Sequence, residues 1–226
     1  VKGWDSFPPK EWADKRWSLP KQLQKDASLA GYAEAVAGAG RGCDRVFYMT
    51  IGSGIGGGLI SDGVIEEGQG FGAAEIGHNW VPDPWTGKPD KLEHVCSGWA
   101  IGRRARQRIM DGHGSSMPLL VENDLERITA QTVYEAAEQG DSLALTILAE
   151  TCDTLGIAIS NVIALLHPDK VVIGGGVSLM GELFWEPLQE AVAYRVFGPF
   201  RDSWSVVPAA LSEDVVLVGG VLLAFS

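Results

Sequence analysis

Two glycine-rich segments are the parts of this chain best suited to bind a phosphate. Gly52–Gly58 follows the apolar run 46–51, and Gly174-Gly175-Gly176 follows the apolar run Val171–Ile173. A backbone without side chains can approach a phosphate closely and direct its N–H groups at it. Because each segment follows a predicted strand, the pair predicts a nucleotide held from two sides. The candidate nucleotide-binding residues are Gly52, Ser53, Gly54, Gly56, Gly57, Gly174, Gly175 and Gly176.

The first segment has competing interpretations. Gly52-x-Gly54-x-x-Gly57 matches the dinucleotide fingerprint, which needs a helix immediately afterwards. Here Asp62-Gly63 lies between short apolar runs, which is typical of a hairpin. The segment therefore joins two antiparallel strands, and the dinucleotide interpretation fails. The Gly-Lys-Ser/Thr ending of the common phosphate loop is also absent, and a glycine-rich hairpin or bulge without a ligand stays open as the alternative.

Carboxylates and a histidine in predicted loops supply a second kind of chemistry. Glu75 and His78 form a Glu-Ile-Gly-His segment, Glu93 follows soon after, and Asp26 stands at the start of an alanine-rich stretch. A carboxylate accepts hydrogen bonds from two adjacent hydroxyls of a polyol, and a general base takes the proton from a hydroxyl that attacks a phosphate. The alternatives are a helix cap for Asp26, surface charges for the two glutamates and a core histidine for His78.

The elements that position these residues follow from apolar periodicity and turn residues. Helices are predicted over 21–39, 97–111, 130–139, 141–166 and 180–196 and from about 214 onward. Strands are predicted over 46–51, 58–61, 64–66, 171–173 and 205–207, and residues 79–91 are predicted to be a proline-rich loop. Hairpins followed by α/β crossover units predict a three-layer α/β domain with ligands at the carboxyl ends of strands. Four arginines after Ser97 are predicted to form a solvated helix face: Arg103, Arg104, Arg106 and Arg108.

Composition and charge exclude several classes of protein. Of the 226 residues 46% are apolar, which supports a sizeable core, and the formal net charge of −11 argues against a nucleic-acid surface. No apolar run reaches the roughly 18 residues of a membrane span, and no signal peptide is visible. Cys43, Cys96 and Cys152 lack a metal-site pattern and are predicted to be reduced thiols. These features predict a cytoplasmic protein with small-molecule ligands and no nucleic-acid or membrane partner.

Several motifs in one order resemble the ROK family of sugar kinases and repressors, within the actin-like ATPase superfamily. The resemblance runs from about residue 20 to the end of the chain. Thr50–Gly58 resembles the second phosphate loop of the family, Glu75–His78 its Glu-x-Gly-His sugar motif, and Leu92-Glu93 with Ser97-Gly98 the segment that supplies another sugar-binding glutamate. Lys25-Asp26-Ala27-Ser28 aligns with the family's Asn-Asp-Ala-Asn, in which the aspartate is the catalytic base. Residues 140–168, 171–178 and 215–223 resemble its long helix, its adenosine-side loop and its closing helix.

The resemblance implies an actin-like ATPase (ribonuclease H-like) fold, with a mixed sheet flanked by helices. It implies ATP-dependent phosphorylation of a hexose or amino-hexose hydroxyl, with Asp26 as the base and with ATP and Mg²⁺ as cofactors. The implied substrate-binding residues are Lys25, Glu75, His78 and Glu93. A homo-oligomer, a dimer by expectation, is implied as well. The alternative is a non-catalytic sugar-sensing regulator or a pseudo-kinase.

Three departures from the family pattern bear on these expectations. Lys25 and Ser28 replace two asparagines, one of which contacts the sugar in the family, so the identity of the sugar stays open. The cysteine-rich zinc motif is missing from Val81–Lys91, and no structural zinc is expected because such a site needs four ligands. The first phosphate motif, Asp-x-Gly-Gly-Thr, is absent as well.

The third departure leads to an expectation about domains. Residues 1–44 are expected to be a remnant of the small lobe and hinge that carries the catalytic-Asp helix, and residues 45–226 the large lobe. Phosphoryl transfer needs charge stabilisation from opposing sides. With the small lobe incomplete, this chain alone is therefore expected to bind sugar or nucleotide weakly and to be inactive.

Overall fold

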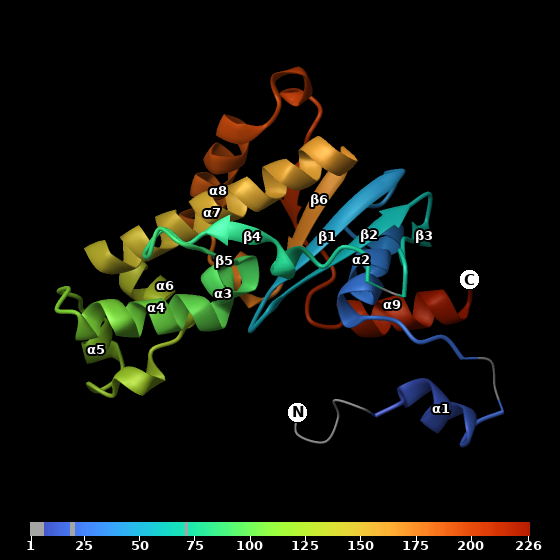
Figure 1. Cartoon of the computed structure of the whole chain (residues 1–226), viewed down its shortest axis with the longest axis horizontal. Coiled ribbons are helices and arrows are strands. Elements are labelled where there is room, and N and C mark those ends of the chain that lie inside the picture. Colours follow the sequence, from blue (N-terminus) through green and yellow to red (C-terminus); the bar gives the residue numbers. More distant parts are fainter. Residues whose placement is uncertain (1–6, 19–20, 71) are drawn as a thin grey trace.

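A five-stranded mixed sheet forms the centre of the fold, in the order β3-β2-β1-β6-β7 (Figure 1). The structure, a computed structural model, describes residues 7–18, 21–70 and 72–226, and residues 1–6, 19–20 and 71 lie outside that description. β1 pairs antiparallel with β2 and parallel with β6, so the carboxyl ends of β1, β6 and β7 lie at the same end of the sheet. The strands are β1 (Arg45–Ile51), β2 (Ile55–Ser61), β3 (Val64–Ile65), β6 (Lys170–Gly174) and β7 (Val206–Pro208).

Two helices, α2 (Asp26–Ala37) and α9 (Val215–Ala224), cover one face of this sheet. The small side chains of α2 let it approach the strands closely, and Ala30 and Ala33 share a buried cluster with Tyr48. α9 in turn packs directly on the backbone of α2. A Cβ at Gly219 would lie only 2.1 Å from the carbonyl oxygen of Leu29. This packing fixes α2 against the sheet and thereby positions Asp26 at its first turn.

The opposite face is covered by α7 (Ser142–Leu166) and α8 (Glu182–Arg195). Asp141 caps the start of α7, because its Oδ1 accepts a hydrogen bond from the N–H of Ala144 at 2.9 Å, and His167, with φ 42°, follows its last residue. By length and composition alone α7 could cross a membrane, but 61% of its most apolar window is buried. Its position between sheet and outer helices identifies it as the core helix of this fold.

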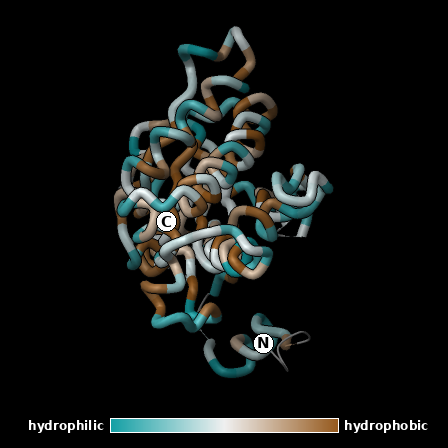
Figure 2. The backbone as a smooth tube through the Cα atoms, turned by 90° about the vertical axis from the view of Figure 1, so that its left-hand side faces the viewer, coloured by the Kyte–Doolittle hydropathy of each residue, from teal (hydrophilic) through white to brown (hydrophobic). Residues whose placement is uncertain are grey.

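A smaller layer of helices packs against α7: α3 (Leu92–Cys96), α4 (Gly98–Met110) and α6 (Ala130–Glu138). Short elements complete the description; Figure 1 shows α1 apart from the sheet, and the turned view of Figure 2 shows the coil near the N-terminus apart from the rest of the chain. These are α1 (Pro9–Asp14), η1 (Ile76–His78), β4 (Trp80–Pro82), β5 (Pro89–Lys91), α5 (Met117–Leu120), η2 (Leu125–Arg127), η3 (Gly176–Leu179) and η4 (Gly198–Phe200).

The structure confirms the expected strands and long helices with shifted ends, and it corrects two expectations. Residues 79–91 contain a hairpin, because β4 and β5 pair with Trp80 opposite Lys91. A two-stranded ladder has only edges, so its prolines cost no interior hydrogen bond. The prediction of a solvated arginine face is wrong for Arg104 and Arg108. Both side chains are buried, and both face Glu150 of α7.

Candidate active site

A cavity of about 480 Å³ lies at the carboxyl ends of β1 and β6, beside the first turn of α2. It brings the predicted base together with the second glycine segment, because Asp26, Thr50 and Gly174–Gly176 all line it. Asp26 Oδ1 accepts a hydrogen bond from the N–H of Ala27 at 2.7 Å. The carboxylate thus stands at the N-terminal, positive end of the α2 dipole.

The second glycine segment is shaped by close backbone packing. Gly175 has φ 86°, and a Cβ there would lie 2.5 Å from the carbonyl oxygen of Ile51, so only glycine fits. A Cβ at Gly174 would lie 2.4 Å from the hydroxyl of Tyr48. Tyr48 is buried beside the cavity, and this burial raises the pKa of its hydroxyl above the ordinary value.

Polar residues in this cavity were not singled out from the sequence: Thr50, Ser178, Ser212 and Glu213. Thr50 lies two residues before Gly52, and Ser178 lies two residues after Gly176, so their positions in the sequence were an available signal. Ser212 and Glu213 come from the turn before α9 and carry no such signal. The cavity therefore contains more hydrogen-bonding groups than the glycine pattern indicated.

The loop Gly52–Gly54 forms the tip of the β1–β2 hairpin. Its backbone is fixed internally, because the N–H of Gly52 donates to the carbonyl of Gly54 at 2.9 Å and the N–H of Gly98 donates to the carbonyl of Gly52 at 2.7 Å. Within the described residues, the N–H groups of Ser53 and Gly54 donate to no protein acceptor. A second cavity of about 430 Å³ joins Gly52 and Ser53 to Gly176. The two glycine segments thus meet in space, as the nucleotide interpretation requires.

Other glycines of the first segment serve packing. A Cβ at Gly57 would lie 2.4 Å from the carbonyl oxygen of Ala74, and one at Gly58 would lie 2.8 Å from that of Ala27. At Gly56 the Cβ of Ala27 would be 3.0 Å away. By contrast, a Cβ at Gly52 would meet no described atom within 4 Å. The ligand interpretation and the packing interpretation therefore apply to different glycines of one motif.

Lys25, Glu75 and His78 form a cluster beside the first turn of α2. Lys25 Nζ lies 2.8 Å from Glu75 Oε1 and donates to the carbonyl of Ala73 at 2.6 Å. His78 Nδ1 lies 3.9 Å from Glu75 Oε2, and its side chain is 60% exposed. The interpretation of His78 as a core histidine is therefore wrong, and Glu75 is a paired charge. Half-exposed polar groups of both signs are suited to a hydroxyl-rich ligand.

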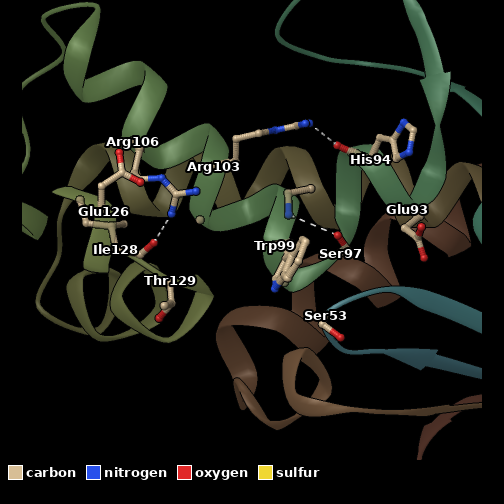
Figure 3. A pocket seen from close by; sticks show the side chains of 13 residues that line it. Ser53, Glu93, His94, Ser97, Trp99, Arg103, Arg106, Glu126, Ile128 and Thr129 are labelled. Atoms are coloured by element: carbon tan, nitrogen blue, oxygen red, sulfur yellow. Dashed lines mark hydrogen bonds between the residues drawn. The ribbon is translucent and has the colours of Figure 1, made fainter. Parts of the chain in front are cut away.

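Glu93 contacts the phosphate-loop hairpin directly. Its Oε2 accepts a hydrogen bond from the N–H of Ile55 at 2.9 Å, and a Cβ at Gly54 would lie 2.5 Å from the same oxygen. Glu93 also lines a third cavity, of about 630 Å³, together with Ser53 and Trp99 (Figure 3). The sugar candidate Glu93 and the phosphate candidate Ser53 are thus neighbours.

The described residues contain no group of three or more His, Cys, Asp and Glu side chains that could hold a metal ion. Cys96 and Cys152 are buried and unpaired, and Cys43 is half-buried. Burial raises the pKa of the Cys152 thiol to about 12 and raises that of Cys96 as well. Both thiols stay protonated at neutral pH, which removes them from nucleophilic chemistry.

Comparison with known proteins assigns the chain to a family. The sequence profile of the ROK family matches residues 2–226. The chain belongs to the ROK family. This ROK chain is 33% identical to the glucokinase of Halalkalibacterium halodurans over 226 residues, covering 96% of this chain and 67% of that protein. It is 34% identical to the glucokinase of Thermotoga maritima over 220 residues, covering 96% of this chain and 69% of that protein.

Solved ROK structures share the architecture of this chain. A ROK glucokinase from Streptomyces griseus in complex with glucose and AMPPNP superposes with a TM-score of 0.82 at 32% identity, covering 95% of this chain and 71% of that chain. A ROK hexokinase from Thermus thermophilus superposes with a TM-score of 0.81 at 26% identity, covering 97% of this chain and 70% of that chain. The ROK chain described here has the actin-like ATPase fold, with its mixed sheet flanked by helices.

Proposed function

We propose that the protein carrying this chain is an ATP-dependent sugar kinase that phosphorylates a hydroxyl of a hexose or amino-hexose. The observation that carries the proposal is the position of Asp26, which lines the same cavity as Gly174–Gly176 at the carboxyl ends of β1 and β6. Ligands of open α/β sheets bind at this end of the strands. Glucokinases among its relatives, and the complex of one ROK glucokinase with glucose and AMPPNP, support the same activity.

In the proposed reaction Asp26 takes the proton from the sugar hydroxyl that attacks the γ-phosphate. A positioned carboxylate of this kind contributes about 10²–10⁴-fold to the rate. Lys25, Glu75, His78 and Glu93 hold the sugar by hydrogen bonds, because their half-exposed polar atoms suit a polyol. The reaction depends mainly on positioning and on charge stabilisation, since phosphoryl transfer requires little covalent chemistry from the protein.

We propose that the nucleotide lies between the two glycine segments, where the N–H groups of Ser53 and Gly54 are available to its phosphates. Mg²⁺ is expected to arrive with ATP, and one or two carboxylates usually complete its coordination. Glu213 lines the same cavity and fits that donor set, which leaves the carboxylate of Asp26 free to act as the base. When bound, Mg²⁺ would neutralise the phosphate charge that develops during transfer.

A coupled ATP assay over hexoses and amino-hexoses tests the proposal, using the full protein that carries this chain and its Asp26→Asn variant. Asparagine keeps the hydrogen bond to the N–H of Ala27, so we expect an unchanged fold and a loss of turnover of about a hundredfold or more. Sugar binding by the wild type without turnover would contradict the kinase and favour a sugar-sensing regulator. Cytoplasmic location and a homodimer belong to the same proposal, and light scattering tests the dimer.

A further inference from the structure

Two consecutive arginines of α4 hold the end of α3. Arg103 Nη2 donates to the carbonyl oxygen of His94 at 2.8 Å, and Arg104 Nη2 donates to that of Val95. A helix as short as α3 leaves its last carbonyls without intrahelical partners, so these bonds satisfy groups that the helix itself cannot. Because both acceptors directly follow Glu93, the arginines hold the backbone next to that glutamate.

The second arginine is anchored on its other side by a partly buried carboxylate, that of Glu150. Arg104 and Arg108 are 8% and 7% exposed, and both face Glu150 of α7. Arg108 Nη2 lies 2.9 and 2.7 Å from the two oxygens of Glu150, and Arg104 Nη1 lies 3.6 Å from one of them. Within the described residues Arg104 Nη1 and Arg108 Nε have no hydrogen-bond partner. Such a cluster is a poor source of stability, because desolvation offsets the Coulombic gain.

Arg108 also contacts the β4–β5 hairpin. Its guanidinium lies over the ring of Trp85, 4.4 Å from the ring centroid. The N–H of Trp85 donates to Asp83 Oδ1 at 2.9 Å, which fixes the turn at the hairpin tip. This hairpin is the segment between His78 and Glu93. Arg104 therefore contacts the chain just after Glu93, and Arg108 contacts the hairpin that joins His78 to Glu93.

We propose that Arg104, held by Glu150, is a positioning residue for Glu93, and that Arg108 does the same for the hairpin between His78 and Glu93. The inference rests on the proposed sugar site. Glu93 has to keep its 2.9 Å bond to the N–H of Ile55 and also reach the sugar, so a small displacement of α3 breaks one of the two. A misplacement of about 1 Å can cost roughly a hundredfold in rate.

The test compares Arg104→Met and Arg104→Lys in the full protein that carries this chain, with Arg127→Met as control. Arg127 is an exposed arginine that pairs with Glu122 at 3.1 Å, and within the described residues it makes no hydrogen bond or ion pair with α3 or α7. Arg104→Met should raise the KM for sugar at least tenfold and leave the KM for ATP within twofold. Arg104→Lys should recover most of the effect, because lysine can still donate to Val95. The control should match the wild type.

Amide exchange at Ile55 supplies a readout that does not depend on sugar. Arg104→Met should speed exchange of this N–H at least tenfold, because Glu93 no longer holds it. If the wild type neither binds nor phosphorylates sugar, the proposed function fails while faster exchange still supports the positioning role. An unchanged sugar KM with unchanged exchange overturns the inference. So does a parallel rise of both KM values with a lower unfolding midpoint, which marks a merely structural role.

If Arg104→Met does not fold, Glu150→Gln replaces it, since glutamine keeps the volume and removes the charge. We expect the same selective rise in the KM for sugar at a smaller size, about threefold, together with faster exchange at Ile55. A folded Glu150→Gln protein with a wild-type KM for sugar and wild-type amide exchange at Ile55 overturns the inference.

Discussion

Two glycines of one motif should respond in opposite ways to the same substitution. In Gly57→Ala the new methyl group would lie 2.4 Å from the carbonyl oxygen of Ala74 and 3.2 Å from Ile76 Cγ2. In Gly52→Ala the methyl group meets no described atom within 4 Å, and the backbone φ of Gly52 lies outside the left-handed region. The first change therefore strains the protein, and the second places a methyl group in the cavity that Gly52 lines.

The size of each effect follows from these distances. At position 57 the backbone of Ala74 or of β2 has to move, and overpacking of this kind costs about 1–3 kcal/mol. Removing glycine from the unfolded chain offsets about 0.4–1 kcal/mol of that cost. A net loss of about 1–2 kcal/mol lowers the Tm of a domain of this size by roughly 2–8 °C. Gly52→Ala has no overpacking cost and keeps only the gain from restricting the unfolded chain, so its Tm should be equal to or slightly above the wild-type value.

Calorimetry of unfolding and of nucleotide binding together decide the case. Gly52→Ala should lose at least tenfold in nucleotide affinity, which is about 1.4 kcal/mol, because the methyl group keeps phosphates from the N–H groups of Ser53 and Gly54. Gly57→Ala, measured well below its Tm, should bind nucleotide within twofold of the wild type. Full nucleotide affinity in Gly52→Ala would refute the placement of the phosphates at this loop. An unchanged Tm in Gly57→Ala would refute the packing argument.

Asp141→Ala should destabilise the protein by about 1–2 kcal/mol, and Asp141→Asn by less, because asparagine still caps α7; urea unfolding at pH 7 measures both. Burial would raise the pKa of Asp141, but hydrogen bonds from Ala144, Ser116 and Ser115 hold it below its ordinary value of 3.8. The charged carboxylate therefore stabilises the fold above pH 3.8, and this stabilisation is lost as the pH falls through the depressed pKa. If the unfolding free energies of the wild type and Asp141→Asn ran parallel below about pH 4, that would contradict this reasoning. Lys25→Met should weaken sugar binding about tenfold and change stability by less than about 1 kcal/mol, because the ion pair with Glu75 is partly exposed; titration calorimetry and thermal unfolding check the two halves. Elemental analysis should find no stoichiometric zinc, and a chelator should leave the Tm unchanged.

Local patterns predicted most of the fold because the relevant signals are local. The apolar run that forms β1, the Asp62-Gly63 turn and the apolar stripe of α7 each depend on residues that lie close together in the sequence. Gly52–Gly54 and Gly174–Gly176 were likewise predicted correctly at strand ends, since the strands themselves were recognisable, whereas Gly56–Gly58 lie inside β2. The β4–β5 hairpin was missed because its prolines argue against strands, and only its edge position makes them acceptable.

The contacts of the site depend on pairs that no local pattern reveals. Lys25 reaches Glu75, Glu93 reaches the N–H of Ile55, and Arg108 reaches Glu150, all across long stretches of chain. An arginine-rich helix is normally solvated, and nothing near Arg104 indicates that α7 brings a carboxylate beneath it. Likewise, only the three-dimensional distances separate Gly57, which packs, from Gly52, which faces open space.

The close approach between position 54 and Glu93 has a consequence for how this protein can vary. A Cβ at position 54 would lie 2.5 Å from Glu93 Oε2, so any other residue there displaces the carboxylate. The displaced carboxylate would also leave the N–H of Ile55 without its acceptor. Positions 54 and 93 should therefore covary among related proteins. A relative with a larger residue at 54 should carry a shorter side chain at 93, and exchanging both together should be tolerated better than either change alone.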